Sequence, residues 1–300
     1  MKWEGNRQSD NVEDRRDQSG GGGGGGFRMG GGRGMGLGTI VIALIAGWIF
    51  GINPMTVLGI LGGGDSVAPQ VSQAPAKRPP RDDAMASMVG TVLADTEDVW
   101  GEIFKQAGAQ YPAPKLTLFR GATQTACGAG QAAMGPFYCP ADSKVYIDLS
   151  FYETMKNKLG APGDFAQAYV IAHEVGHHVQ NVLGTSRKVD AMRGKISERE
   201  QNQLSVRLEL QADCYAGVWA HHTEKKYKTQ GKTWLEKGDI EEAMNAAQAI
   251  GDDALQQKSQ GRIVPDSFTH GTSQQRMRWF NQGIQTGSVK SCDTFSAKQL

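Results

Sequence analysis

The chain has 300 residues, enough for one large domain or two smaller ones, and its 32 Lys and Arg residues nearly balance its 31 Asp and Glu residues. This balance lacks the basic excess of a nucleic-acid-binding protein, so no nucleic acid partner is expected. Glycine is abundant, with 40 residues, and is concentrated near the N-terminus, which marks a boundary in composition.

Residues 1–36 are predicted to be a disordered, glycine-rich cytoplasmic tail. They combine six basic and five acidic side chains with the glycine run at 20–26, so they offer little apolar surface to bury. No Gly-Lys-Ser/Thr follows the run, which excludes a phosphate-binding loop. A flexible tether is the expected role.

Residues 37–61 are predicted to form one transmembrane anchor. The uncharged core at 37–52 has 16 residues, about 24 Å of helix, and the uncharged stretch continues past Pro54, so a tilted or kinked span is long enough. A cleaved signal peptide is the alternative, but a 36-residue leader does not normally precede one. Arg28 and Arg33 come before the span, so the positive-inside rule places the N-terminus in the cytoplasm and the rest outside it.

A linker rich in Pro, Gly and Ser over 62–82 leads to a folded domain expected over 83–300. The domain is predicted to be α+β, mostly helical with a small sheet. In chain order, we expect a helix at 83–107, a strand at 115–119, irregular chain at 121–140, a half-buried strand at 144–149, and helices at 164–184, 197–222, 239–249 and 273–285. Asp164 is the expected cap of one helix, and Ser197 with Glu200 fits a capping box for the next.

All four cysteines follow the predicted anchor, and an even number in an exported domain favours disulfides. Three pairings are possible. We favour Cys127 with Cys139, because twelve residues can close a loop, which leaves Cys214 with Cys292. Four free thiols in a reducing compartment are the alternative.

The segment AYVIAHEVGHHVQN, residues 168–181, places two histidines and a glutamate in an otherwise apolar helix. Residues four apart share one face of a helix, so His173 and His177 can bind one metal ion while Glu174 reaches a water bound to it. Ordinary surface or core histidines are the alternative, but a buried and unpaired histidine pair would be costly.

A catalytic zinc needs three protein ligands and an open position. The segment VRLELQADCYAGVWA, residues 206–220, carries Glu209 and Asp213 four apart, and these like charges repel unless a cation lies beside them. We expect Glu209 to be the third ligand and Asp213 to accept a hydrogen bond from the back of a ligand histidine. An exposed acidic pair is the alternative. The histidines not expected to be ligands are His178, beside the metal site or on the surface, and His221 and His222, at a helix C-terminus.

Two segments carry a resemblance to known families. The pattern His173-Glu174-x-x-His177 with the later Glu209-x-x-x-Asp213 resembles the gluzincin metallopeptidases, and HEVGHHVQNVLG with ELQADCYAGVWA resembles the bacterial neutral zinc metallopeptidase family (YpfJ-like). The resemblance extends to SDNVEDRR (9–16), GPFYCPADSKVYIDLSFY (135–152) and AIGDDALQ (249–256), so it covers nearly the whole chain. It implies a zincin-like fold, a bound Zn²⁺, a protein or peptide substrate, and a place at the bacterial inner membrane facing the periplasm.

A further segment, SFTHGTSQQRMRWF (267–280), is similar to a Thr-His-Pro…Arg segment of membrane-linked gluzincins. Gly271 stands where that pattern has proline, which puts the local turn in question. The resemblance implies that His270 and Arg276 contact the substrate and the transition state, where a donor would stabilise the oxyanion. A helix N-terminus with a surface arginine is the alternative. By analogy with the fold, the strand at 145–149 is expected to pair with an extended substrate.

The expected function is that of a membrane-anchored zinc endopeptidase, in which Glu174 accepts the proton of the attacking water and delivers it to the leaving amine. One alternative is a non-catalytic, zinc-stabilised scaffold, although such a site has no use for Glu174. The other is a zinc amidase acting on a non-protein substrate, which the same ligands would serve.

Overall fold

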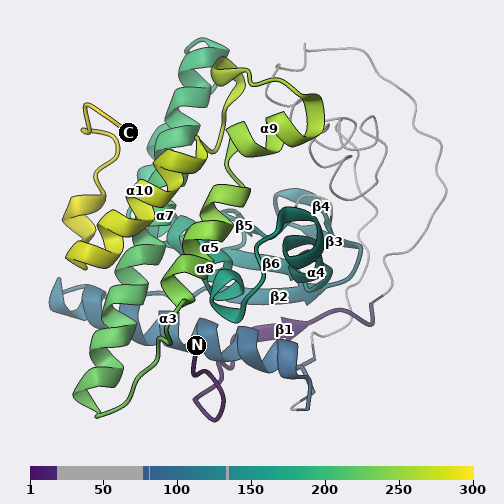
Figure 1. The fold of residues 1–300 in the computed structure, drawn as a ribbon, viewed down its shortest axis with the longest axis vertical. Coiled ribbons are helices and arrows are strands. Elements are labelled where there is room, and N and C mark those ends of the chain that lie inside the picture. The colour runs from purple at the N-terminus through teal and green to yellow at the C-terminus, as the bar shows by residue number, and fades with distance from the viewer. Residues whose placement is uncertain (19–76, 81, 133–134) are drawn as a thin grey trace.

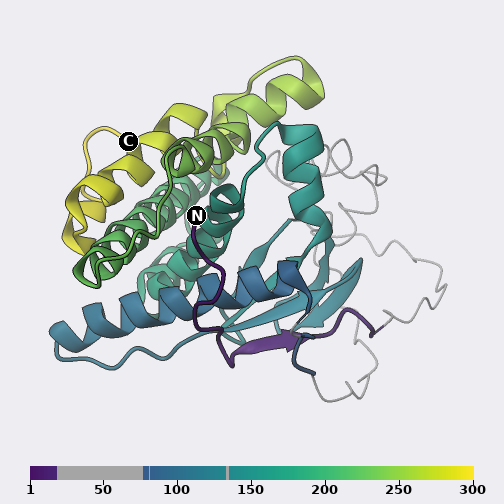
Figure 2. The ribbon, with the colours of Figure 1, turned by 60° about the horizontal axis from the view of Figure 1, so that its bottom comes forward.

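A computed structural model of the chain describes residues 1–18, 77–80, 82–132 and 135–300 (Figure 1). In this part of the chain a small sheet lies beside a group of helices (Figure 2), which confirms the α+β, mostly helical class. None of the described helices is both long and apolar enough to span a membrane. The anchor expected at 37–61 and most of the linker expected at 62–82 lie outside the described residues.

The main sheet has the strand order β1-β2-β6-β5, in which β1, β2 and β6 are parallel and β5 is antiparallel to β6. The strands are β1 (Val12–Asp14), β2 (Lys115–Phe119), β5 (Phe137–Cys139) and β6 (Lys144–Asp148), and a separate hairpin is formed by β3 (Ala122–Thr125) and β4 (Gly128–Gln131). The strands expected at 115–119 and 144–149 are confirmed. The expectation of irregular chain at 121–140 is wrong, because β3, β4 and β5 lie there.

Both faces of β6 are covered. Val145 and Ile147 belong to the main core on one face, while Tyr146 is 1% exposed on the other, stacked on Phe137 with ring centroids 5.0 Å apart. The sequence predicted that this strand would be half-buried, and this prediction is wrong. The strand also pairs with β2 along one edge and with β5 along residues 144–146 of the other, so among the described strands only residues 147–148 lack a partner on that second edge.

The expected long helices are confirmed, and their ends agree within two residues except that the helix expected to end at 222 continues to Thr229. They are α3 (Ala84–Gln106), α5 (Asp164–Val182), α7 (Glu198–Thr229), α8 (Asp239–Ala249) and α10 (Ser273–Thr286), and the additional elements are α4 (Ser150–Thr154), the π-helix η2 (Met155–Leu159), α6 (Thr185–Asp190), α9 (Asp252–Gln260), η3 (Pro265–Ser267) and η4 (Val289–Cys292). The capping box of Ser197 and Glu200 is present. The expected cap at Asp164 is wrong, because Gly163 is the N-cap and Asp164 instead contacts the amino group of Met1 at 2.9 Å.

Residues 1–18 pack against the domain, so the expectation that 1–36 is a disordered tail is wrong for this part. Val12 is 5% exposed in β1, which pairs with β2. The charges that suggested disorder have partners far along the chain, since Glu13 binds Lys144 at 2.9 Å and Arg16 binds Asp83 at 2.5 Å. This packing conflicts with the expected orientation, which placed the N-terminus and the domain on opposite sides of a membrane.

Helices α5, α7 and α10 come into close backbone contact at two glycines. A Cβ added to Gly176 of α5 would lie 2.9 Å from the carbonyl oxygen of Ala212 in α7. A Cβ added to Gly217 of α7 would lie 2.1 Å from the carbonyl oxygen of Phe280 in α10. These two close approaches bring the side chains of all three helices into one site.

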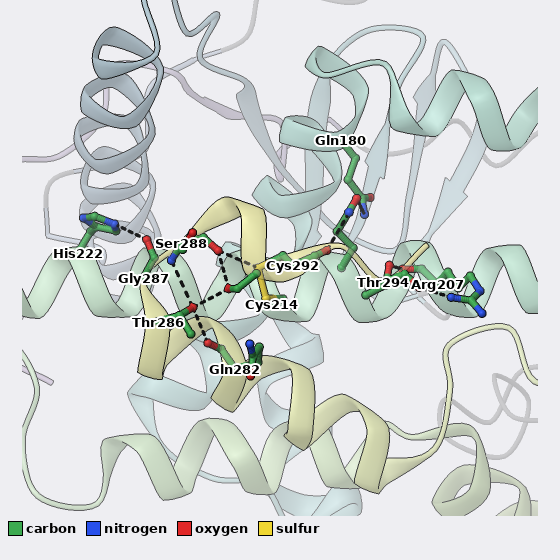
Figure 3. Close-up of a disulfide and its surroundings, with 12 residues drawn as sticks. Gln180, Arg207, Cys214, His222, Gln282, Thr286, Gly287, Ser288, Cys292 and Thr294 are labelled. Carbon is green, nitrogen blue, oxygen red and sulfur yellow. Dashed lines mark hydrogen bonds between the residues drawn. A yellow bond between two sulfur atoms is a disulfide. The ribbon is translucent and has the colours of Figure 1, made fainter. Parts of the chain in front are cut away.

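Both favoured disulfides are confirmed. Cys127–Cys139 joins the turn of the β3–β4 hairpin to β5. Cys214–Cys292 joins α7 to η4 near the C-terminus (Figure 3).

Candidate metal centre

The three expected ligands meet between α5 and α7. His173 Nε2 lies 3.1 Å from one carboxylate oxygen of Glu209, and His177 Nε2 lies 3.4 Å from the other. The three ligand atoms all lie within 4.8 Å of one another. The sequence prediction of His173, His177 and Glu209 as one group therefore agrees with the geometry.

The geometry of these atoms fits a zinc ion. Two ligand atoms about 2.0–2.1 Å from a tetrahedral zinc are about 3.3 Å apart, close to the two separations in this cluster. The donor set of two imidazoles and one carboxylate is also that of catalytic zinc sites with an open position. Burial would lower the pKa of His177, but the charge and hydrogen bond of Glu209, together with Glu174 and Gln180, raise it to about 9, so the cluster favours a positive charge.

His173 is held from behind by a buried network. Its Nδ1 lies 2.8 Å from Asp213, as expected, and Asp213 also accepts a 2.5 Å hydrogen bond from the hydroxyl of Tyr169. Burial alone would raise the pKa of Asp213, but Arg276 and His173 hold it at about 2. The ionised carboxylate fixes the Nδ1–H tautomer of His173, which leaves Nε2 free to bind a metal.

Arg276 belongs to this network and not to the position expected for it. Its Nε and Nη2 each donate to Asp213 at 2.9 Å, and the residue is 2% exposed. The guanidinium thus lies behind His173. We assign it to holding Asp213, rather than to contact with an oxyanion.

Glu174 is buried beside the ligands, with 7% of its surface exposed. Burial raises its pKa, an effect that His177 and His173 oppose. A buried carboxylate in this position can accept a proton from a water molecule and release it again, as a general base requires.

Burial would lower the pKa of His270, but the charges of Glu209 and Asp252 raise it above its ordinary value. Its Nδ1 is 3.3 Å from Asp252, and one oxygen of Asp252 accepts the backbone N–H groups of residues 269–271 at 2.7–3.0 Å. Gly271 has φ of +92°, which proline cannot adopt. The turn thus differs from the Thr-His-Pro pattern, and Asp252 builds it.

The other histidines serve packing. His178 accepts from the hydroxyl of Tyr138 in β5 at 3.0 Å and donates to the carbonyl of Pro112 at 2.6 Å, because that carbonyl can only accept. His221 and His222 bond the carbonyls of residues 284 and 287. They therefore bond carbonyl groups at the C-terminus of α10. The sequence predicted a role at a helix C-terminus, but it is not the C-terminus of α7, the helix that carries both histidines.

Three functional residues escaped sequence reasoning. Tyr169 and Gln180 lie on α5 together with the ligand histidines, but nothing in their spacing predicts a contact with another helix. Asp252 is inside the segment AIGDDALQ, and its position one residue after a glycine at a helix start was the only local signal.

The chain belongs to the family described as "Putative neutral zinc metallopeptidase", whose model matches residues 1–295. The family description supports a zinc-dependent hydrolase acting on peptide bonds. Among its relatives, YpfJ of Escherichia coli strain K12 is 55% identical over 299 residues, covering 98% of this chain and 99% of that protein. Rv2575 of Mycobacterium tuberculosis strain H37Rv is 44% identical over 197 residues, 63% of this chain and 65% of that protein. Both are named as uncharacterized proteins, and no solved structure matches the chain.

Proposed function

We propose that this protein is a zincin-like, zinc-dependent endopeptidase. The observation that carries the proposal is that Glu209 of α7 faces the Nε2 atoms of His173 and His177 on α5, with Glu174 buried beside them. A structural zinc site normally has four protein ligands. Three ligands and an adjacent buried carboxylate favour catalysis over a scaffold role.

The residues divide the chemistry among them. A bound Zn²⁺ would lower the pKa of a water molecule to about 7 and polarise the scissile carbonyl. Glu174 accepts a proton from the attacking water and passes it to the leaving amine. His270, held by Asp252, is assigned the role of donor to the developing oxyanion. Arg276 keeps Asp213 ionised, so that His173 presents Nε2.

The substrate is proposed to pair with β5. Among the described strands β5 has only one partner, β6, and lies at the end of the sheet. An extended peptide can add to such an edge through main-chain hydrogen bonds. Tyr138 of β5 connects this edge to the motif helix through His178.

The place of action is proposed to lie outside the cytoplasm. Two disulfides persist in oxidising compartments and are rare in reducing ones. Attachment to the bacterial inner membrane through residues 37–61 remains a proposal from the sequence.

The test uses the purified full-length chain and its variants Glu174→Gln and Glu209→Ala. We expect the parent to bind zinc and to cleave a mixed peptide library until a chelator is added. Glu174→Gln should keep zinc and lose cleavage, and Glu209→Ala should lose zinc. Zinc binding without chelator-sensitive cleavage would favour a scaffold, and hydrolysis of non-peptide amides alone would favour an amidase. If Glu209→Ala binds zinc like the parent, the ligand set is wrong.

A further inference from the structure

The second ligand histidine, His177, has its own support on the side away from Glu209. Its Nδ1 lies 2.9 Å from Oε1 of Gln180, which is fully buried one turn along α5. The amide nitrogen of Gln180 donates to the carbonyl of Leu208 at 2.7 Å and to Oε1 of Gln211 at 3.1 Å. Leu208 and Gln211 lie on α7, so this contact joins the two metal-binding helices.

The direction of these hydrogen bonds is determined by the backbone. A carbonyl oxygen only accepts, so Leu208 requires the NH₂ end of the Gln180 amide, and Oε1 must then face His177. His177 therefore donates from Nδ1, and its neutral, metal-binding form has the lone pair on Nε2, the nitrogen that faces Glu209. In the same way the amide of Gln211 donates to the carbonyl of Cys292 at 3.0 Å, which turns its Oε1 to Gln180.

The chain of hydrogen bonds ends at the second disulfide. Cys292 is fully buried and bonded to Cys214, which directly follows Asp213 in α7 (Figure 3). Cys292 thus supports His177 through the two glutamines, while Cys214 adjoins the residue that holds His173. The other disulfide, Cys127–Cys139, is linked to none of the ligands by a hydrogen bond within the described residues.

We propose that Gln180 and Gln211 are positioning residues that hold His177 in its metal-binding tautomer and orientation, and that the Cys214–Cys292 disulfide anchors them. This inference depends on the metal site of the proposed function. Residues that orient a metal ligand from behind typically change metal affinity by about 10–100-fold when they are replaced.

The test measures the zinc affinity of the full-length protein by competition with a chromogenic chelator, and the visible spectrum of its Co²⁺ form. Gln180→Met should weaken zinc binding about 10–100-fold and alter the Co²⁺ spectrum, and Gln211→Met should act in the same direction. The double variant should be less weakened than the sum of both, because one chain of bonds is broken twice.

Matched controls separate positioning from general damage. Gln256 of α9 is an equally buried glutamine, and it bonds Val264 and Ser267 rather than any ligand residue. Gln256→Met should therefore lower stability and leave zinc affinity within about twofold. Replacing Cys214 and Cys292 by serine should weaken zinc binding, whereas replacing Cys127 and Cys139 should not.

The outcomes distinguish this inference from the proposed function. If the parent binds zinc and both glutamine variants bind it equally well with an unchanged Co²⁺ spectrum, the positioning role of Gln180 and Gln211 is overturned. If Gln256→Met weakens zinc binding as much as Gln180→Met does, a positioning role is also overturned. A parent that binds no zinc overturns the proposed function itself. Should the Cys214/Cys292 variant not fold, Gln211→Met decides, since it leaves the disulfide intact.

Discussion

Gly176 lies directly against the backbone of Ala212, where α5 crosses α7, and this contact sets the distance between the ligands of one helix and that of the other. A Cβ at Gly176 would meet the Ala212 carbonyl oxygen at 2.9 Å and its Cα at 3.1 Å. Neither backbone atom can rotate away, so the helices themselves would have to separate.

Gly176→Ala should therefore lower both stability and zinc affinity. We expect the free energy of unfolding to fall by about 1–3 kcal/mol from overpacking and zinc binding to weaken at least about tenfold. Chemical denaturation and chelator competition measure the two. Gly101 of α3 is the control, because no atom lies within 4 Å of its Cβ position, and Gly101→Ala should stabilise the protein slightly. A Gly176→Ala protein with parental zinc affinity would show that the crossing is not what positions the ligands.

Arg276→Met should destabilise the protein through Asp213. It leaves a fully buried carboxylate without its bidentate cation, which typically costs about 3–5 kcal/mol. Zinc affinity should fall as well, because His173 loses its oriented acceptor. Thermal unfolding of the metal-free and zinc-loaded protein checks both. A variant with unchanged stability and zinc affinity but a reduced kcat would instead place Arg276 at the transition state.

Asp252→Asn should lower activity as much as His270→Ala does. Asp252 accepts three backbone N–H groups and contacts His270 Nδ1, so the amide would loosen the turn that presents this histidine. We expect kcat/KM to fall about 10–100-fold, as for His270→Ala, with zinc content unchanged. Steady-state kinetics of the single and double variants test this. Additive losses in the double variant would mean that the two residues act independently.

Glu13→Gln should lower stability in a pH-dependent way. Burial would raise the pKa of Glu13, but Lys144, Lys115 and Arg15 lower it to about 2 from an ordinary value of 4.5. The carboxylate therefore contributes stability that is fully present above about pH 4.5 and is lost as the pH falls toward 2. The side chain is near the surface, so we expect a difference of about 1–2 kcal/mol at pH 7 that vanishes near pH 2. Urea unfolding across this range measures it, with the exposed Glu4→Gln as a control of little effect.

Single cysteines at residues 17 and 299 should have the same accessibility in cells. Both positions are exposed, and the native cysteines are paired, so only the engineered thiol reacts. Because β1 pairs with β2, a membrane-impermeant maleimide applied to intact spheroplasts should label both variants or neither. Labelling of only one of the two would contradict the packing of residues 1–18.

The ligand set could be predicted from the sequence because its members come in two pairs, each on one helix. The spacing of four residues within a pair places both side chains on the same face of that helix. His173 with His177, and Glu209 with Asp213, needed no knowledge of the fold beyond a meeting of two helices. The roles of Arg276, Asp252 and Gln180 depend on contacts between separate helices, which spacing does not reveal. The N-terminal strand was missed for a different reason, since Glu13 binds Lys144 and Arg16 binds Asp83, which are 131 and 67 residues away in the sequence.

Asp14 pairs with Lys77 in an isolated bridge, so two points far apart in the sequence are held side by side at the edge of β1. β1 and the candidate metal centre therefore belong to one folded body, and the segment SDNVEDRR contributes a strand to the domain instead of forming a separate tail.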